Sequence, residues 1–168
     1  MESKFTNYTA FLKNLEELCS KIYVHYSSDI NCEHKCSSCC ISGLTLLPVE
    51  ADYIRDSIKE MNIVPNKKNK CFFLNDNSCQ IYQFRPVVCR TQGFPLIYRD
   101  DEKKEIHISN CELNFKSTKE PIKIDGNYVI DMDKINMVLS AINIEYTEKL
   151  KQKNDKRTPI EQLIIKRN

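Results

Sequence analysis

The sequence predicts one small α+β domain, in which an irregular, cysteine-rich metal core with short β-hairpins is covered by amphipathic N-terminal and C-terminal helices. Nine cysteines occur in 168 residues, and eight of them lie within residues 31–112. Apolar residues recur at helical spacing over residues 5–29 and 131–153, whereas the cysteine-rich part has short runs separated by turn residues. Because this length is typical of one domain, we expect a single unit over residues 1–168.

The N-terminal flank, residues 5–29, carries its apolar side chains at three-and-four spacing, which predicts a packing helix with one apolar face. A second helix is predicted after the first cysteine cluster. Thr45 is its expected N-cap, with Pro48 and Glu50 in the first turn, where proline and acidic residues are favoured. We expect this helix to end near Asn62.

The middle of the chain predicts short and irregular elements. Two apolar runs in residues 71–82 flank the turn sequence NDNS, a pattern typical of a β-hairpin. Residues 83–98 contain Pro86, Gly93 and Pro95, so we expect an irregular wrap there instead of a long regular element.

Strands and helices are also predicted in the last third of the chain. Residues 104–108 and 122–130 alternate well enough for short strands, the second turning at an Asp-Gly pair. The C-terminal flanking helix is expected over residues 131–153. A short terminal helix is expected over residues 158–168, where it would either dock back onto the domain or bind a partner.

Composition narrows the partners and the location. Hydrophobic residues make up 41% and charged residues 29% of the chain, and the formal net charge is +2. Such a small charge gives no reason to expect a nucleic-acid or anionic-membrane partner. No apolar run approaches the roughly 18 residues of a membrane span, and the start of the chain lacks a signal-peptide pattern. We therefore expect a cytoplasmic protein.

This location determines how the cysteines are interpreted. A reducing compartment disfavours disulfides, and cysteine-dense cytosolic chains more often bind metal or act as enzymes. Cys19 lies alone on the apolar stripe of the first helix, so we interpret it as a small buried hydrophobe. His34 lies inside the first cluster but is not needed beside eight thiols. The candidate metal ligands are Cys32, Cys36, Cys39, Cys40, Cys71, Cys79, Cys89 and Cys111.

The spacing of these cysteines suits a metal but leaves its identity open. Cys36-x2-Cys39 is the short chelating loop of zinc knuckles and iron-sulfur sites, and eight thiols suffice for two four-thiolate centres. Adjacent Cys39 and Cys40 do not easily chelate one tetrahedral ion, which favours a multinuclear site or two neighbouring sites. We therefore place an iron-sulfur cluster first and Zn²⁺ second, since thiolates select both.

Several motifs together resemble the YkgJ-type cysteine-cluster family, which is described as a putative zinc- or iron-chelating domain with a CxxCxxCC motif. They are the cluster C-x3-C-x2-CC from Cys32 to Cys40, the run Cys71-x-Phe73-Leu74, the run Cys79-x-Ile81-Tyr82-x2-Arg85-Pro86-x2-Cys89-Arg90, and Phe94-Pro95. The resemblance covers Cys32 to Cys111 and implies that the same eight cysteines are the ligands. One difference is that three residues, not two, separate Cys32 from Cys36.

Three classes of function follow from these patterns. The first is a metal-binding protein with a redox or metal-carrying role. The second is an S-adenosylmethionine-dependent iron-sulfur enzyme, because the family resemblance extends to flagellin lysine N-methylases. The third is a zinc-stapled structural or interaction module. The Cys32-x3-Cys36-x2-Cys39 spacing also matches the cluster loop of radical S-adenosylmethionine enzymes, although the chain is too short for their usual barrel.

Other enzyme classes lack a motif, since G-x-S-x-G, P-loop, G-x-G-x-x-G and H-E-x-x-H patterns do not occur. Four thiolates around a divalent ion leave negative charge, so nearby cations are expected to compensate it. The candidates are Lys35, Arg85, Arg90 and Arg99, of which Arg99 is interpreted as a surface cation.

Overall fold

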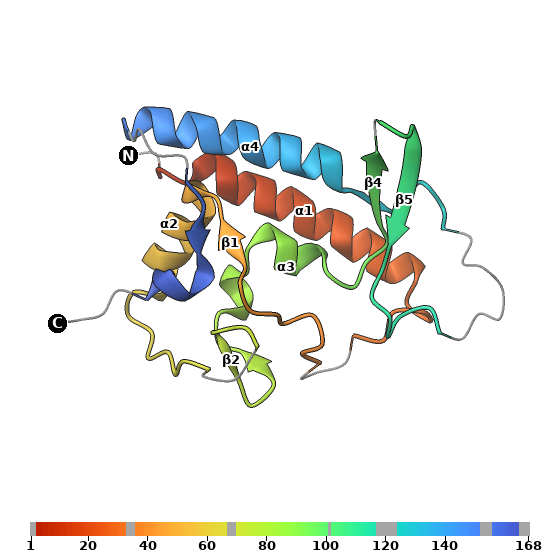
Figure 1. Ribbon diagram of the computed structural model, residues 1–168, viewed down its shortest axis with the longest axis horizontal. Coiled ribbons are helices and arrows are strands. Elements are labelled where there is room, and N and C mark those ends of the chain that lie inside the picture. Colours follow the sequence, from red (N-terminus) through yellow and green to blue (C-terminus); the bar gives the residue numbers. More distant parts are fainter. Residues whose placement is uncertain are drawn as a thin grey trace.

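The computed structural model describes residues 3–32, 36–66, 70–100, 102–116, 124–151 and 156–164, and it confirms an α+β fold (Figure 1). Two long helices lie beside each other along one side of the molecule, and the cysteine-bearing segments lie on the opposite side of α1. In chain order the elements are α1 (Thr6–His25), β1 (Thr45–Leu46), α2 (Pro48–Ile58), β2 (Leu74–Asn75), β3 (Ser78–Cys79), the 3₁₀ helix η1 (Tyr82–Phe84), α3 (Val87–Thr91), β4 (Leu96–Asp100), β5 (Glu105–Ser109), β6 (Ile130–Asp131), α4 (Met132–Lys149), β7 (Thr158–Pro159) and the 3₁₀ helix η2 (Ile160–Leu163).

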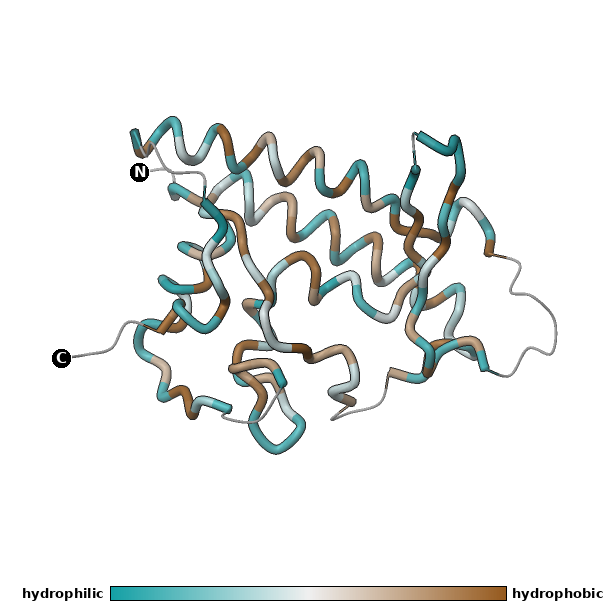
Figure 2. Tube along the Cα trace, viewed as in Figure 1, coloured by the Kyte–Doolittle hydropathy of each residue, from teal (hydrophilic) through white to brown (hydrophobic). Residues whose placement is uncertain are grey.

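The two flanking helices follow the predicted apolar periodicity. Figure 2 shows hydrophobic and hydrophilic residues alternating along the turns of α1 and α4, as expected for helices with one apolar face. The helices pack against each other through the stacked rings of Phe5 and Tyr146, whose centroids are 5.7 Å apart. Asp131 caps α4 by accepting a hydrogen bond from the Lys134 amide at 3.2 Å. This contact confirms the predicted start of the helix.

The start of α2 differs from the prediction. Thr45 is not its N-cap but part of β1, which pairs with β7 in an antiparallel ladder. Leu47 takes the N-cap position and Pro48 is the first helical residue, because the fixed φ of proline suits that place and its missing amide costs nothing there. The Glu50 carboxylate accepts the Leu47 amide at 3.3 Å. The helix ends at Ile58, before the expected end near Asn62.

The predicted hairpin at residues 71–82 is confirmed as β2 and β3. Leu74 pairs with Cys79 across the two strands, which leaves Asp76 and Asn77 as a two-residue loop. Both loop residues have positive φ, 45° and 58°. Asparagine and aspartate tolerate that conformation, which matches the right-handed twist of the strands in a type I′ turn.

The irregular wrap predicted for residues 83–98 is wrong in part, because it contains two regular elements. Pro86 stands at the N-cap of the short helix α3, and β4 begins directly after Pro95. Gly93, with φ at +98°, makes the bend between them. The prolines and the glycine therefore separate these elements instead of excluding them.

β4 is the central strand of a three-stranded sheet in the order β5-β4-β6. β5 pairs with it antiparallel over the predicted strand at residues 104–108, whereas β6 pairs with it parallel. The turn predicted at the Asp-Gly pair within residues 122–130 is confirmed, but residues 124–129 form no strand on either side of it. Residues 122 and 123 lie outside the described part. That turn is held by a hydrogen bond from the Tyr128 amide to the Asp125 carbonyl, at 2.9 Å.

The predicted terminal helix at 158–168 is also wrong within the described residues. Residues 158–159 form β7 and residues 160–163 form η2, because pairing with β1 holds the first two residues extended. The Ile160 amide continues this attachment by donating to the Leu44 carbonyl at 2.9 Å. The segment therefore docks back onto the domain, while residues 165–168 lie outside the described part.

Two apolar clusters form the core. The first lies between α1, α4 and the three-stranded sheet, and the second joins α2, the β2–β3 hairpin and η2. In the described residues, no helix has both the length and the apolar character needed to cross a bilayer. The second cluster contains Cys71 and borders Cys40 and Cys79, so the core and the candidate metal ligands adjoin there.

Candidate metal centre

The candidate cysteines come from stretches far apart in sequence that the fold brings to one side of the molecule. Cys36, Cys39 and Cys40 lie in the loop before β1, and the β2–β3 hairpin and α3 lie near that loop, below α1 in Figure 1. Cys89 is on α3, and Cys111 follows β5. All nine cysteines are free thiols in this structure.

Four of these thiols lie on β3, on α3 or at the second apolar cluster. We call Cys40, Cys71, Cys79 and Cys89 the inner group. The Cys71 amide donates to the Cys40 carbonyl at 3.2 Å, which ties the cluster loop to the start of the hairpin. Cys79 belongs to β3, and the side chain of Cys71 is buried. These contacts fix the backbone on which the inner thiols stand.

Burial and mutual proximity favour the protonated form of the inner thiols. Burial, followed by the neighbouring thiols Cys71 and Cys79, raises the pKa of Cys89 to about 12. The hydrogen bond with Cys39 raises the pKa of Cys40 and lowers that of Cys39 to about 6. Cys39 is therefore the thiol most ready to ionise at neutral pH, as a metal ligand must.

The remaining thiols are more exposed and lie on loops. We call Cys32, Cys36, Cys39 and Cys111 the outer group. The first three are exposed, and Cys111 is partly buried. Burial raises the pKa of Cys32, and so do the thiols at Cys111, Cys36 and Cys39, which places these groups within electrostatic range of one another.

Asn114 is the residue that joins the two ends of the outer group. Its side-chain amide donates to the Gly93 carbonyl at 2.6 Å and contacts the Cys32 sulfur at 3.8 Å. Its side-chain oxygen accepts the Asn31 amide at 2.8 Å, and its own amide donates to the Cys111 carbonyl at 2.9 Å. Asn114 thus fixes Cys32 and Cys111 on the same support, although they are far apart in sequence.

Gly93 and Asn114 were not among the predicted site residues. A Cβ placed on Gly93 would lie 3.0 Å from the Cys32 sulfur and 3.6 Å from the Asn114 side chain. The only sequence signal for Gly93 was its rarity, because the chain contains just three glycines. Asn114 carries no signal beyond its place three residues after Cys111.

Of the four predicted compensating cations, Arg85 fits the role. Its charge lowers the pKa of Cys39, Cys79 and Cys89, opposing the rise that burial causes in the last two. The guanidinium lies over the Tyr82 ring, 3.6 Å from the centroid. Its Nε is buried and has no hydrogen-bond partner among the described residues. This N–H is available to a negatively charged group bound near the thiols.

Arg90 has a different role, which is to hold the backbone before α3. It pairs with Glu16 and donates to the carbonyls of Arg85 and Gln83, both at 2.7 Å. Cys19 lies on the same side of α1, where its sulfur is 3.8 Å from the Arg90 carbonyl. Burial raises its pKa to about 11, as for a thiol in an apolar core.

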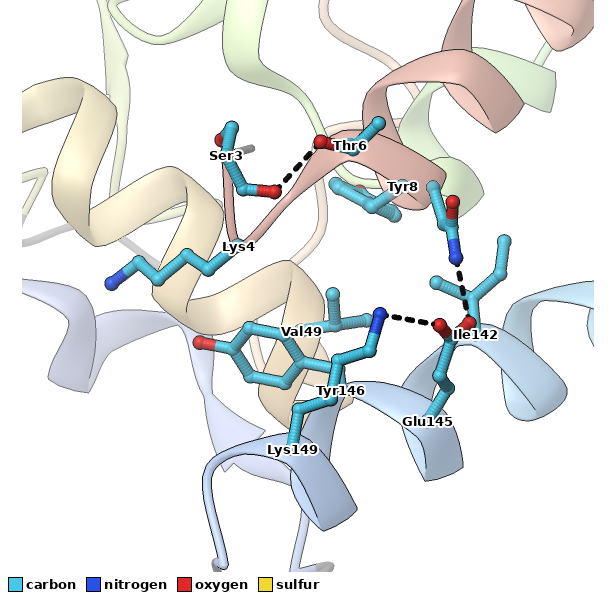
Figure 3. A pocket seen from close by; sticks show the side chains of 10 residues that line it. Ser3, Lys4, Thr6, Tyr8, Val49, Ile142, Glu145, Tyr146 and Lys149 are labelled. Carbon is cyan, nitrogen blue, oxygen red and sulfur yellow. Dashed lines mark hydrogen bonds and ion pairs between the residues drawn. The ribbon is translucent and has the colours of Figure 1, made fainter. Parts of the chain in front are cut away.

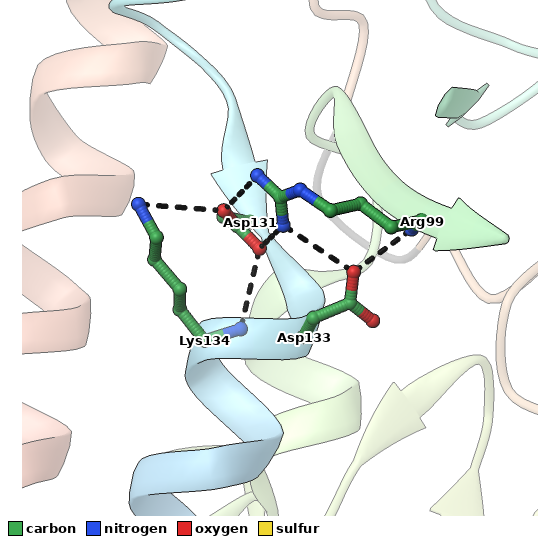
Figure 4. Close-up of polar contacts among 4 residues, drawn as sticks. All are labelled: Arg99, Asp131, Asp133 and Lys134. Carbon is green, nitrogen blue, oxygen red and sulfur yellow. Dashed lines mark hydrogen bonds and ion pairs between the residues drawn. The ribbon is translucent and has the colours of Figure 1, made fainter. Parts of the chain in front are cut away.

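Arg99 is far from this chemistry and lies on the sheet, as expected for a surface cation. Figure 4 shows its guanidinium between Asp131 and Asp133. The Arg99 hydrogen bond lowers the pKa of Asp131 to about 2. Lys35 and His34 lie outside the described residues, so their predicted roles stay predictions.

A pocket of about 240 Å³ lies between the start of α1 and the end of α4 (Figure 3). Its lining includes Lys4, Asn7, Glu145 and Lys149, and Glu145 accepts hydrogen bonds from both Asn7 and Lys149. No cysteine lines this pocket. It is therefore separate from the candidate metal ligands.

The donor set suits a soft or borderline metal, but its thiols are not drawn together around one point. Within the described ranges, no three side chains of His, Cys, Asp or Glu are placed to hold an ion as they stand. The available donors are thiols, which select zinc, iron-sulfur clusters and copper(I). The unpartnered Arg85 Nε supplies a positive group beside them. By this chemistry the residues fit a thiolate-bound metal, whose binding would have to draw the loop thiols together.

Comparison with known proteins agrees with this donor chemistry. Residues 31–112 match the family model described as "CxxCxxCC: Putative zinc- or iron-chelating domain". No curated protein and no solved structure shows significant similarity to the chain. The matched segment begins one residue before Cys32 and ends one residue after Cys111, so it contains every candidate ligand. The comparison therefore supports the resemblance to the CxxCxxCC family over residues 31–112, the cysteine-bearing part of the chain.

Proposed function

We propose that this protein binds an iron-sulfur cluster or zinc through about eight cysteine thiolates and has a redox or metal-carrying role. The observation that carries the proposal is the gathering of free thiols from the loop before β1, the β2–β3 hairpin and α3 beside one cation, Arg85. The ligands are Cys32, Cys36, Cys39, Cys40, Cys71, Cys79, Cys89 and Cys111.

The electrostatics support a metal as the natural partner of these thiols. Packed thiols resist ionisation, as the raised pKa of Cys89 illustrates, because burial disfavours the thiolate and the neighbouring thiolates repel it. A bound cation reverses that balance, since it stabilises thiolates directly and deprotonates coordinating thiols. The Arg85 Nε can then donate to a sulfur whose negative charge persists in the complex.

Iron-sulfur is our first choice and zinc the second. The Cys39–Cys40 pair supports a multinuclear site or two adjacent sites, because neighbouring thiolates chelate one tetrahedral ion poorly. Anaerobic purification, metal and sulfide analysis, and optical spectra before and after dithionite test this choice. Iron with equal acid-labile sulfide and a bleachable band near ~400 nm is the expected result. Stoichiometric zinc without colour would overturn the iron assignment, and the absence of both metals would overturn the proposal.

A second function is favoured by one observation, the packing of Cys71 inside the second apolar cluster. A metal at that place would act as a staple for α2, the hairpin and η2, as structural zinc does in small domains. This zinc-stapled module would bind one redox-inactive ion and lose its fold on chelation. Retention of the native circular dichroism after complete metal removal would exclude it.

A further inference from the structure

The structure divides the candidate thiols into two groups with different environments, and this division rests on the proposed function. In the inner group, Cys79 stands on β3, Cys89 on α3 and Cys71 at the start of the hairpin. Cys40 lies in the loop before β1, and it packs with Cys71 and Cys79 at the second apolar cluster. The outer group stands on loops, and three of its four thiols are exposed. Unequal burial of two donor sets predicts unequal access of chelators and competing ligands to any metal that they hold.

The two groups meet at the Cys39–Cys40 peptide. Cys40 is tied inward, because its carbonyl accepts the Cys71 amide and its side chain packs against the second cluster. Cys39 is exposed, and the two-residue spacing from Cys36 makes these two a chelating pair.

Separate supports hold the two groups. Asn114 and Gly93 fix Cys32 and Cys111 of the outer group. The inner group depends instead on the backbone bond between Cys71 and Cys40 and on the pairing of Leu74 with Cys79. The backbone of either group can therefore be perturbed without direct contact with the supports of the other.

We propose that the chain has two thiolate centres of unequal lability: a retained inner centre on Cys40, Cys71, Cys79 and Cys89 that stabilises the fold, and an exchangeable outer centre on Cys32, Cys36, Cys39 and Cys111. The outer centre is the one that delivers or exchanges metal. Its exposed thiols are open to attack by a competing thiol ligand, whereas release from the inner centre requires the hairpin to open away from its apolar cluster.

The test uses Zn²⁺ as the probe on reduced, anaerobic full-length protein. Wild type should retain two zinc ions per chain after gel filtration. A chromophoric chelator should remove one of them at least tenfold faster than the other. Cys36→Ser should retain one zinc, lose the fast phase of release and keep the thermal midpoint of zinc-loaded wild type within a few degrees. Cys19→Ser, a buried thiol outside both groups, is the matched control and should behave as wild type.

Cys79→Ser should lose the slow phase of zinc release and unfold at a lower temperature. If Cys79→Ser does not fold, the Cys36→Ser variant still decides the proposal. Release of both zinc ions in one phase, or loss of both from Cys36→Ser, would overturn the division into two centres. Failure of wild type to bind zinc or iron at all would instead overturn the proposed function. The two failures are thus distinguishable by the metal content of wild type alone.

Discussion

Asn114→Ala tests whether one buried side chain supports the outer thiols. Its side chain is 3% exposed and makes two normal hydrogen bonds, with the Asn31 amide at 2.8 Å and the Gly93 carbonyl at 2.6 Å. Each is worth about 1 kcal/mol net, and the buried partners left unsatisfied raise the loss somewhat further, so we expect a loss of about 2–3 kcal/mol. For a chain of this size the thermal midpoint should fall by roughly 5–10 °C.

The assay is urea unfolding of reduced protein followed by circular dichroism, together with zinc content after gel filtration. Asn127→Ala is the matched control, because Asn127 lies in an exposed turn and, within the described residues, its side chain donates a hydrogen bond only to Asp125. It should change the free energy of unfolding by less than about 0.5 kcal/mol. Asn114→Ala should also weaken zinc retention by the outer group, because Cys32 and Cys111 lose their common support. An Asn114→Ala variant as stable as Asn127→Ala would refute the reasoning.

Three further predictions concern Gly93, Glu50 and Arg85. Gly93→Ala should lower the free energy of unfolding by about 1–2 kcal/mol because of the positive φ at this position, and it should lower it further because the new Cβ would displace the Cys32 sulfur. Urea unfolding measures this loss, and a Gly93→Ala variant as stable as Gly126→Ala would contradict the prediction. Burial raises the pKa of Glu50, so its contribution to stability is present below its ordinary value of 4.5 and is lost as pH rises through the raised value. The stability of wild type relative to Glu50→Gln should therefore fall as the pH rises above 4.5, and parallel pH profiles would exclude this. Arg85→Gln should move the midpoint pH of zinc uptake upward, because Arg85 opposes the raised pKa of Cys89, while Arg85→Lys should move it less; identical midpoints in a pH titration would argue against this role.

The sequence was sufficient for elements whose signal is local. The apolar stripes of α1 and α4 repeat over many turns, and the NDNS turn places two residues that tolerate positive φ between matched apolar runs. α3 escaped prediction because five residues are too few to show a helical period. β7 escaped it because its partner is distant: Thr158 pairs with Leu46. Such pairings are set by packing and not by neighbouring residues.

The same limit applies to the site. Cysteine spacing identifies donor chemistry, because thiols at short intervals are rare outside metal sites in a reducing compartment. It does not say which thiols lie together, and the supports that decide this are Asn114 and Gly93, neither of which carries donor chemistry of its own. The role of His34 and Lys35 and the S-adenosylmethionine-dependent alternative stay predictions.

The position of Cys39 and Cys40 links the metal question to the stability of the fold. Cys40 belongs with the second apolar cluster, whose other members include Ile160 and Leu163 of η2, so an inner metal would hold the C-terminal segment as well as the hairpin. Cys39 is exposed, and its hydrogen bond with Cys40 lowers its pKa to about 6. Under the two-centre proposal, a single peptide bond would separate a ligand whose metal is tied to folding from a ligand whose metal is open to solvent. Because metal affinity and folding free energy are coupled only where the donors are part of the core, the two ligands should respond differently to chelators even though they are neighbours in sequence.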